Sequence, residues 1–202
     1  MKLKVALLFF FSMMFLACQN SNTEKEFVDL GLSVKWASFN IGASEPMDFG
    51  CFYTCEELNI SKTGGADSCE VYNDVVRDNW GDNWRIPTAK EFLELIDKCQ
   101  WEWGSLNGIN GCLVIGPNGN SIFLPAAGYC SASSNSFKGD PSLCKGLMGC
   151  YWSSSSIDDW HNGLSNYMGT GKGWHLGFAS SDKFIDNSLS GFFAMYVRPV
   201  SD

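Results

Sequence analysis

The stretch that organises this chain is residues 80–99, Trp80-Gly81-Asp82-Asn83-Trp84-Arg85-Ile86-Pro87-Thr88-Ala89-Lys90-Glu91-Phe92-Leu93-Glu94-Leu95-Ile96-Asp97-Lys98-Cys99. The Thr88 hydroxyl can accept the N–H of Glu91, and the Glu91 carboxylate can accept the N–H of Thr88; this reciprocal pair is a capping box that begins a helix. Apolar side chains then recur at i, i+3, i+4 and i+7: Phe92, Leu95, Ile96 and Cys99. The pattern predicts an amphipathic helix over about residues 88–99.

Short apolar runs on both sides of this helix predict β-strands. The clearest are residues 111–115 and 121–124, which flank a turn containing Asn118-Gly119, a pair that accepts the positive φ values of a tight hairpin. Strands are also expected within 27–38 and 192–200, where the first can pair with the last and close the domain. The fold class expected is therefore α+β, with short antiparallel strands and paired termini.

Two long segments lack a sustained apolar period. Residues 56–78 carry a Gly64-Gly65 pair, and residues 157–190 alternate short apolar groups with Gly, Ser and Asn. Both are expected to be irregular connections between the ordered elements.

Length and charge restrict the classes of function. A chain of 202 residues is enough for one domain and a targeting segment. Its formal net charge is −8 and it has no cluster of Lys and Arg, which argues against binding to the phosphates of nucleic acids. The acidic balance also gives little attraction to anionic lipid surfaces.

The amino terminus has the order of an export signal. Lys2 and Lys4 precede an apolar run over residues 5–16, which is short for a helix that spans a bilayer. The run ends in Phe15-Leu16-Ala17-Cys18, which resembles a bacterial lipobox. An ordinary secretory signal cut near Ala17 is the alternative.

Under the lipobox interpretation, Cys18 is acylated, with palmitate among the expected acyl chains, and becomes the first mature residue. We expect a signal peptide at 1–17, an acylated tether at 18–26 and a single domain at 27–202. Such a lipid anchor holds a domain at a membrane without spanning it. The expected location is the outer membrane or cell surface, and a domain facing the periplasm is also compatible.

The other eight cysteines support export, because an even set in an oxidising compartment suits disulfides. Candidates for disulfides are Cys51, Cys55, Cys69, Cys112, Cys130, Cys144 and Cys150. The local pairs Cys51–Cys55 and Cys144–Cys150 are the simplest proposals. Cys99 continues the apolar stripe of the helix and is expected to be a free thiol. A zinc site is not expected, because only one cysteine pair has a spacing near that of a zinc ligand pair.

Five segments, in this order, resemble one known family: VDLGLSVKWA at 28–37, NWRIPT at 83–88, GPNGNSIFLPAAG at 116–128, YWSSS at 151–155 and VRPV at 197–200. Together they resemble the major-paralogous-domain (FISUMP-type) lipoproteins of Bacteroidetes. The resemblance implies a C-type-lectin-like fold, related to formylglycine-generating enzymes and to the variable proteins of diversity-generating retroelements. It also implies paired termini, one or two helices and a long loop region that displays binding residues.

Side chains suited to recognition are densest between residues 158 and 175. Aromatic faces stack on sugar rings or apolar ligands, and Asn and His supply directional hydrogen bonds. The candidate ligand-binding residues are Trp160, His161, Asn162, Tyr167, Trp174 and His175. By contrast Trp36, Trp84 and Trp152 lie in segments shared with the family and are expected in the core.

The function expected is that of an exported, lipid-anchored recognition or adhesion domain that binds a glycan or a surface protein through loops 157–190. A structural surface or fimbria-like assembly component is the alternative. An enzyme related to the formylglycine-generating enzymes is the weaker alternative, because a reactive thiol needs an electropositive setting and this chain is acidic. We expect no catalytic residue, metal or cofactor. Asp182, Asp186 and Asn187 offer oxygen ligands for calcium, but no lectin-type Glu-Pro-Asn triplet is present.

Overall fold

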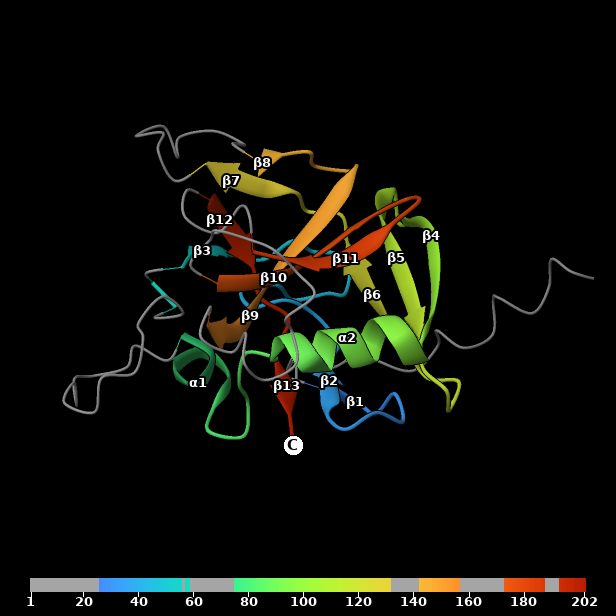
Figure 1. The fold of residues 1–202 in the computed structure, drawn as a ribbon, viewed down its shortest axis with the longest axis horizontal. Coiled ribbons are helices and arrows are strands. Elements are labelled where there is room, and N and C mark those ends of the chain that lie inside the picture. The colour runs from blue at the N-terminus through green and yellow to red at the C-terminus, as the bar shows by residue number, and fades with distance from the viewer. Residues whose placement is uncertain (1–25, 56, 59–74, 132–141, 157–172, 188–192) are drawn as a thin grey trace, which may run out of the picture.

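The computed structural model describes residues 26–55, 57–58, 75–131, 142–156, 173–187 and 193–202. These residues are mostly β-strand with two helices, which confirms the α+β class (Figure 1). Three sheets meet around the core. Helix α2 (Ala89–Lys98) lies across strands of the largest sheet, and α1 (Val75–Trp80) lies at one side of the molecule.

The largest sheet has seven strands, six of them in the order β11-β10-β9-β12-β7-β8, with β3 pairing β12 in addition. The bounds are β3 Phe52–Thr54, β7 Tyr129–Ser131, β8 Ser142–Leu143, β9 Met148–Ser156, β10 Gly173–Ala179, β11 Lys183–Asp186 and β12 Phe193–Tyr196. All pairs are antiparallel except β9 with β12. The prediction that residues 157–190 are irregular is wrong for β10 and β11. Nearly every side chain of β10 is buried, so its sequence lacks the alternation of apolar and polar residues by which a strand is recognised.

Two sheets of three strands complete the fold. One has the order β1-β2-β13, with β1 at Phe27–Val28, β2 at Lys35–Ala37 and β13 at Val200–Ser201. The other has the order β4-β5-β6, with β4 at Gln100–Leu106, β5 at Ile109–Ile115 and β6 at Ser121–Pro125. The pairing of β2 with β13 joins the two ends of the described domain. The strand expected to end the chain, β12, lies instead inside the large sheet.

Helix α2 confirms the predicted capping box. Thr88 is the N-cap, its hydroxyl accepts the N–H of Glu91 at 3.3 Å, and the Glu91 carboxylate accepts the N–H of Thr88 at 2.7 Å. Phe92 and Leu95 are fully buried on the predicted stripe. The helix lies against β9, β10 and β11. Helix α1 was not predicted, because residues 56–78 were expected to be irregular.

The predicted hairpin is also confirmed. Strands β5 and β6 pair from Ile115↔Ser121 onward, and Gly119 in the turn has a φ of 87°. The turn is fastened to the segment after β1, where the Asp29 carbonyl accepts hydrogen bonds from the side-chain amides of Asn118 and Asn120, both at 2.8 Å.

Arg198 joins the ends of the domain to the hairpin. It is fully buried, and its guanidinium donates to the carbonyls of Ala37, Ser38 and Phe123 and to the side chain of Asn40, at 2.8–3.0 Å. Burial lowers its pKa to about 10. Because these acceptors are neutral, Arg198 works as a multiple hydrogen-bond donor inside the fold.

The tryptophans expected in the core lie there. Trp36 and Trp152 are fully buried, and Trp84 is nearly so. The serines after Trp152 bind neighbouring elements: Ser153 donates to the Trp174 carbonyl at 2.9 Å, and Ser155 Oγ accepts the N–H of Ala89 at 3.0 Å, which fixes the start of α2 to β9. Within the described residues, no helix has the length and apolar character needed to cross a membrane.

Candidate functional site

The predicted ligand residues fall into two groups. Trp160, His161, Asn162 and Tyr167 lie outside the described residues. Trp174 and His175 lie on β10 and are fully buried, so their assignment to a ligand surface is wrong. The physical reason is the position of β10 between β9 and β11, with α2 over one face and a second apolar cluster behind the other. A central strand covered on both faces exposes neither set of its alternating side chains.

His175 lies in an apolar environment. Its ring meets that of Trp152 edge-on, with the ring centroids 6.2 Å apart, and neither ring nitrogen has a hydrogen-bond partner within the described part of the chain. Burial lowers the pKa of His175 to about 4, although the Asp186 carboxylate on β11 acts in the opposite direction. The imidazole is therefore neutral at physiological pH.

A groove of about 410 Å³, which we call the tryptophan groove, lies at the end of this buried strand, where Ala179 is part of its lining. It lies between the side chains of β4 and β5, the end of α2 and the turn that joins β10 to β11. Its lining is Ile96, Trp101, Trp103, Cys112, Ala179, Ser180, Ser181, Asp182 and Lys183. The turn lies within the predicted binding region 157–190, whereas the two tryptophans lie far from it in sequence.

Strand β4 places both tryptophans on one face. Trp101 and Trp103 are two residues apart, so their side chains leave the strand on the same side. Both rings contact Phe178 of β10, with centroid distances of 5.6 Å and 6.5 Å. Trp101 Nε1 also donates to the carbonyl of Leu95 in α2 at 3.1 Å. The two rings are half-buried and held from behind, which leaves part of each ring at the groove.

The β10–β11 turn forms the polar side of the groove. Ser180, Ser181 and Asp182 are exposed there. The turn is closed by a hydrogen bond from Ala179 N–H to the Asp182 carbonyl at 2.8 Å, and Asp182 Oδ1 accepts the N–H of Lys183 at 2.8 Å. Two hydroxyls and a carboxylate are thus offered opposite an aromatic wall.

Lys183 joins the two sides of the groove. Its ammonium lies 6.0 Å from the centroid of the Trp101 ring, at the outer limit of a cation–π contact. With Asp182 beside it, the formal charges of the lining cancel. The groove therefore combines flat apolar faces with hydrogen-bonding groups and no net charge, which suits a polar, ring-bearing, neutral ligand.

Cys112 lies in the floor of the groove. It is almost fully buried, and burial raises its pKa to about 11, although the nearby Lys183 ammonium acts to lower it. A thiol with this pKa is protonated at neutral pH and is a poor nucleophile. The same holds for Cys150, whose pKa burial raises to about 12. Neither Cys112 nor Cys150 is therefore activated as a nucleophile.

A second groove, of about 440 Å³, lies beside the β1-β2-β13 sheet. The exposed Phe27 ring stacks there on Trp84, with centroids 4.8 Å apart and planes 12° apart, and the Lys35 ammonium lies 5.7 Å from the Phe27 centroid. One face of Phe27 is thus already occupied by Trp84.

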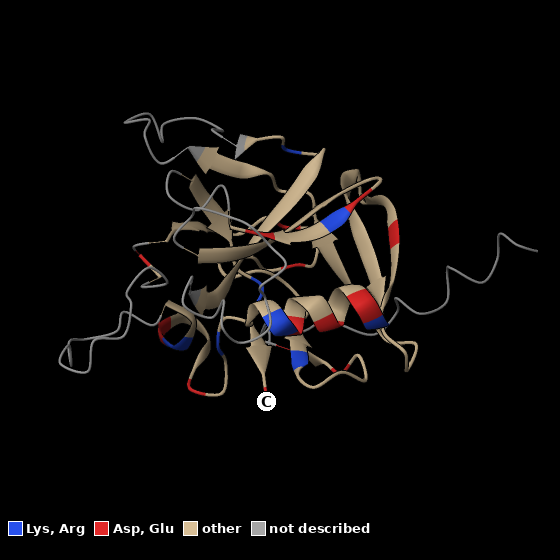
Figure 2. Ribbon diagram, viewed as in Figure 1, with Lys and Arg blue, Asp and Glu red and all other residues tan. Residues whose placement is uncertain are grey.

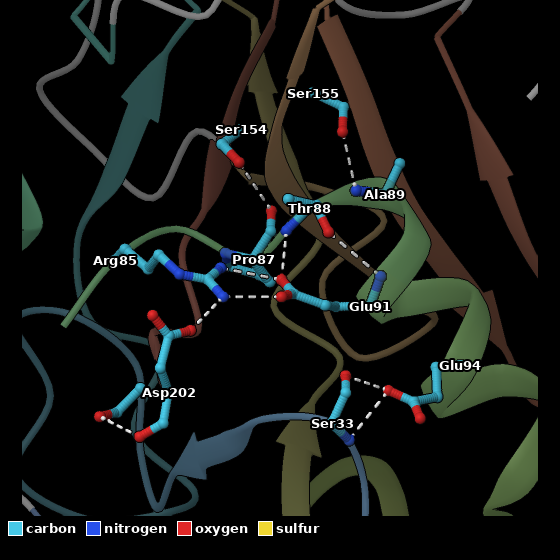
Figure 3. A network of polar contacts seen from close by, with 11 residues as sticks. Ser33, Arg85, Pro87, Thr88, Ala89, Glu91, Glu94, Ser154, Ser155 and Asp202 are labelled. Carbon is cyan, nitrogen blue, oxygen red and sulfur yellow. Dashed lines mark hydrogen bonds and ion pairs between the residues drawn. The ribbon is translucent and has the colours of Figure 1, made fainter. Parts of the chain in front are cut away.

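Arg85, which also lines the second groove, is engaged in a structural network (Figure 3). Its guanidinium donates to both carboxylate oxygens of Glu91, at 3.0 Å and 2.7 Å, and to Asp202 at 2.6 Å. The same Glu91 caps α2 at Thr88. The network fastens the last residue to the start of α2, so Arg85 serves the fold at this groove.

Cys112, Cys144 and Cys150 are free thiols, so the pair Cys144–Cys150 is not formed, and Cys130 is a fully buried residue of β7. The pair Cys51–Cys55 is wrong for a geometric reason. The two residues flank β3, and four steps along an extended strand separate their Cα atoms by about 13 Å, roughly twice the reach of a disulfide. Cys69 lies outside the described residues. Cys99 is a half-buried free thiol, as its place on the helix predicted.

The acidic residues considered for calcium do not converge. Asp182 precedes β11 and Asp186 is its last residue, so the two are about 13 Å apart along the strand. Asn187 is fully buried. Among the described residues, no group of three or more His, Cys, Asp or Glu side chains is placed to hold a metal ion.

Comparison of the chain with protein-family models, with curated proteins and with solved structures gave no match. The candidate site therefore rests on its own geometry. Trp101 and Trp103 were not among the ligand residues predicted from the sequence. Two aromatic residues on one face of a half-buried strand were the signal that could have found them.

Proposed function

We propose that this chain is an exported, lipid-anchored recognition domain that binds a neutral glycan in the tryptophan groove. The observation that carries the proposal is the pairing of two half-open indole rings with the hydroxyls and carboxylate of the β10–β11 turn. Sugar rings present an apolar C–H face and an edge of hydroxyls, and this groove offers a surface for each. Its volume lies in the range of small-ligand sites.

A charged ligand is less well matched to the groove. Asp182 and Lys183 are adjacent, so an acidic sugar would approach the carboxylate and a basic group would approach the ammonium. A neutral pyranose can accept a hydrogen bond from Lys183 and donate one to Asp182 without either penalty.

The lipid anchor and the C-type-lectin-like fold are parts of the same proposal. The order of Lys2, Lys4, the apolar run and Ala17-Cys18 supports the anchor. The pairing of β2 with β13 and the capped helix α2 are compatible with the fold that the family resemblance implies. Labelling of the exported chain with radioactive palmitate, lost in Cys18→Ser, would test the anchor separately from binding.

The binding test is a glycan array followed by calorimetric titration of the best neutral ligand. Wild-type chain is expected to bind, and Trp103→Ala to lower the affinity about tenfold, because it removes one stacking face. Phe27→Ala is the matched control, since it removes an aromatic ring from the second groove. An equal loss of affinity in Trp103→Ala and Phe27→Ala, or no loss of affinity in Trp103→Ala, contradicts the assignment of the site.

A further inference from the structure

The outer edge of β4 is open. Strand β4 pairs with β5 along its whole length, from Gln100↔Ile115 to Leu106↔Ile109, and it is the end strand of its sheet (Figure 1). Within the described residues, no backbone hydrogen bond from a turn or loop reaches this outer edge. Seven residues of unpaired edge form a long template for another strand.

The sequence of β4 suits pairing with itself. Glu102 is its single charged residue (Figure 2). In the antiparallel register that pairs all seven residues of two copies, Trp103 lies opposite Trp103, and Glu102 lies opposite Gly104. Two like charges therefore never face each other across the pair. A second copy of β4 thus places the uncharged Gly104 opposite Glu102, whereas an unrelated extended peptide has no residue already matched to the Glu102 carboxylate.

Gly104 provides the space that this register needs. It is exposed, and a Cβ atom placed on it would meet no atom within 4 Å. The Glu102 side chain of a second copy can lie over this position. On the other face of the strand, the two Trp103 rings would form an aromatic cross-strand pair, an arrangement that stabilises antiparallel strands.

From this edge, its charge pattern and the open glycine, we infer that two copies of the chain associate through antiparallel pairing of β4 with β4. The two sheets then form one six-stranded sheet in the order β6-β5-β4-β4-β5-β6. Both tryptophan grooves lie on the same face of this sheet, side by side. A dimer of this kind would bind a repetitive glycan through two sites, which raises the apparent affinity without a new contact.

The test is sedimentation equilibrium of the exported chain carrying Cys18→Ser, so that lipid-driven micelles do not imitate a dimer. The unsubstituted β4 is expected to give a monomer–dimer equilibrium. Gly104→Glu is expected to weaken the dimer about tenfold, because each of its two copies of Glu102 then faces a second carboxylate. The double variant Glu102→Lys/Gly104→Glu is expected to restore the dimer, since each pair becomes a lysine facing a glutamate.

Lys90→Gln is the matched control, because it lowers the net charge by the same single unit on the exposed side of α2. A chain that stays monomeric at every concentration overturns the inference. A dimer that is insensitive to Gly104→Glu, or that fails to return in the double variant, also overturns it, as does equal weakening by Lys90→Gln. Sedimentation needs no ligand, so its result is independent of the glycan test.

Discussion

Two pairs of aromatic residues, one on the same strand as Phe178 and one packed against its ring, have opposite roles. Trp174 and His175 on β10 are fully buried, whereas Trp101 and Trp103 on β4 are half-open to a groove. Their residue types would suit ligand binding equally well. The difference is the position of the strand, because β10 is central and covered on both faces while β4 is at the edge of its sheet.

The comparison separates stability from recognition. Residues on β10 fill the core, and truncating their side chains should lower the free energy of unfolding. Residues at the tryptophan groove keep part of their surface in water, and truncating their side chains should mainly lower the affinity for the ligand. Substitutions on the two sides of the comparison therefore give different readouts.

The largest effect is expected for Trp174→Ala. Removing a fully buried indole loses its transfer free energy and leaves a cavity, which should lower the free energy of unfolding by about 4 kcal/mol. Urea denaturation followed by circular dichroism measures the change. Leu147→Ala, at a side chain that is 69% exposed, is the control and should change stability by less than about 0.5 kcal/mol. A small effect of Trp174→Ala would mean that β10 is not a core strand.

The next effect is a loss of stability in acid through His175. Its pKa is lowered by burial from 6.5 to about 4 in the folded chain. Between these values the unfolded chain binds a proton that the folded chain does not, so the stabilisation is complete above about pH 6.5 and is lost as the pH falls toward 4. The loss attributable to this group is about 3 kcal/mol.

Denaturation curves recorded from pH 7 to pH 4 measure this dependence. His175→Phe should flatten it, because a neutral ring replaces the imidazole. His161→Phe, at the other histidine of the chain, is the control and should leave the slope in place. If His161→Phe removed the pH dependence of stability instead, the acid sensitivity would arise from His161 and not from His175 on β10.

A smaller effect is expected for Glu91→Gln. The substitution weakens both the Arg85 ion pair and the reciprocal capping bond to Thr88, in a network that is partly open to solvent (Figure 3). The free energy of unfolding should fall by about 1 kcal/mol. Thermal unfolding at low and high salt measures the change, and the difference in stability between the unsubstituted chain and Glu91→Gln should narrow at high salt. Glycan affinity should not change, since Glu91 does not line the tryptophan groove.

The smallest effect is expected for Lys183→Met at the tryptophan groove. Its ammonium is exposed and distant from the Trp101 ring, so stability should stay within about 0.5 kcal/mol. Affinity for a neutral glycan should fall about threefold through the loss of one hydrogen-bond donor. Titration calorimetry measures it, and an unchanged affinity would move the ligand away from the β10–β11 turn.

Local sequence signals predicted the elements that depend on a few neighbouring residues. Thr88 and Glu91 predicted the start of α2, and Asn118-Gly119 predicted the hairpin of β5 and β6. Signals that depend on distant neighbours were weaker. Strand β10 carries buried side chains on both faces and has no period, and α1 is only six residues long, so neither was expected.

The candidate site shows the same division. The region expected to bind a ligand, 157–190, includes Ser180 to Asp182, which line the tryptophan groove. The sequence analysis also assigned Trp174 and His175 to the ligand surface, because they are near this turn in the chain. Both residues are instead fully buried on β10. Trp101 and Trp103 are about eighty residues away and reach the turn only when β4 packs against β10.

By itself, the sequence determined the α+β class, the capped helix and the hairpin, since each follows from local spacing and backbone preference. Only the tertiary structure decided which aromatic residues are core and which line a groove. The physical reason is that burial depends on what covers a strand, and the cover over β10 and the open edge of β4 are supplied by elements far away in the chain.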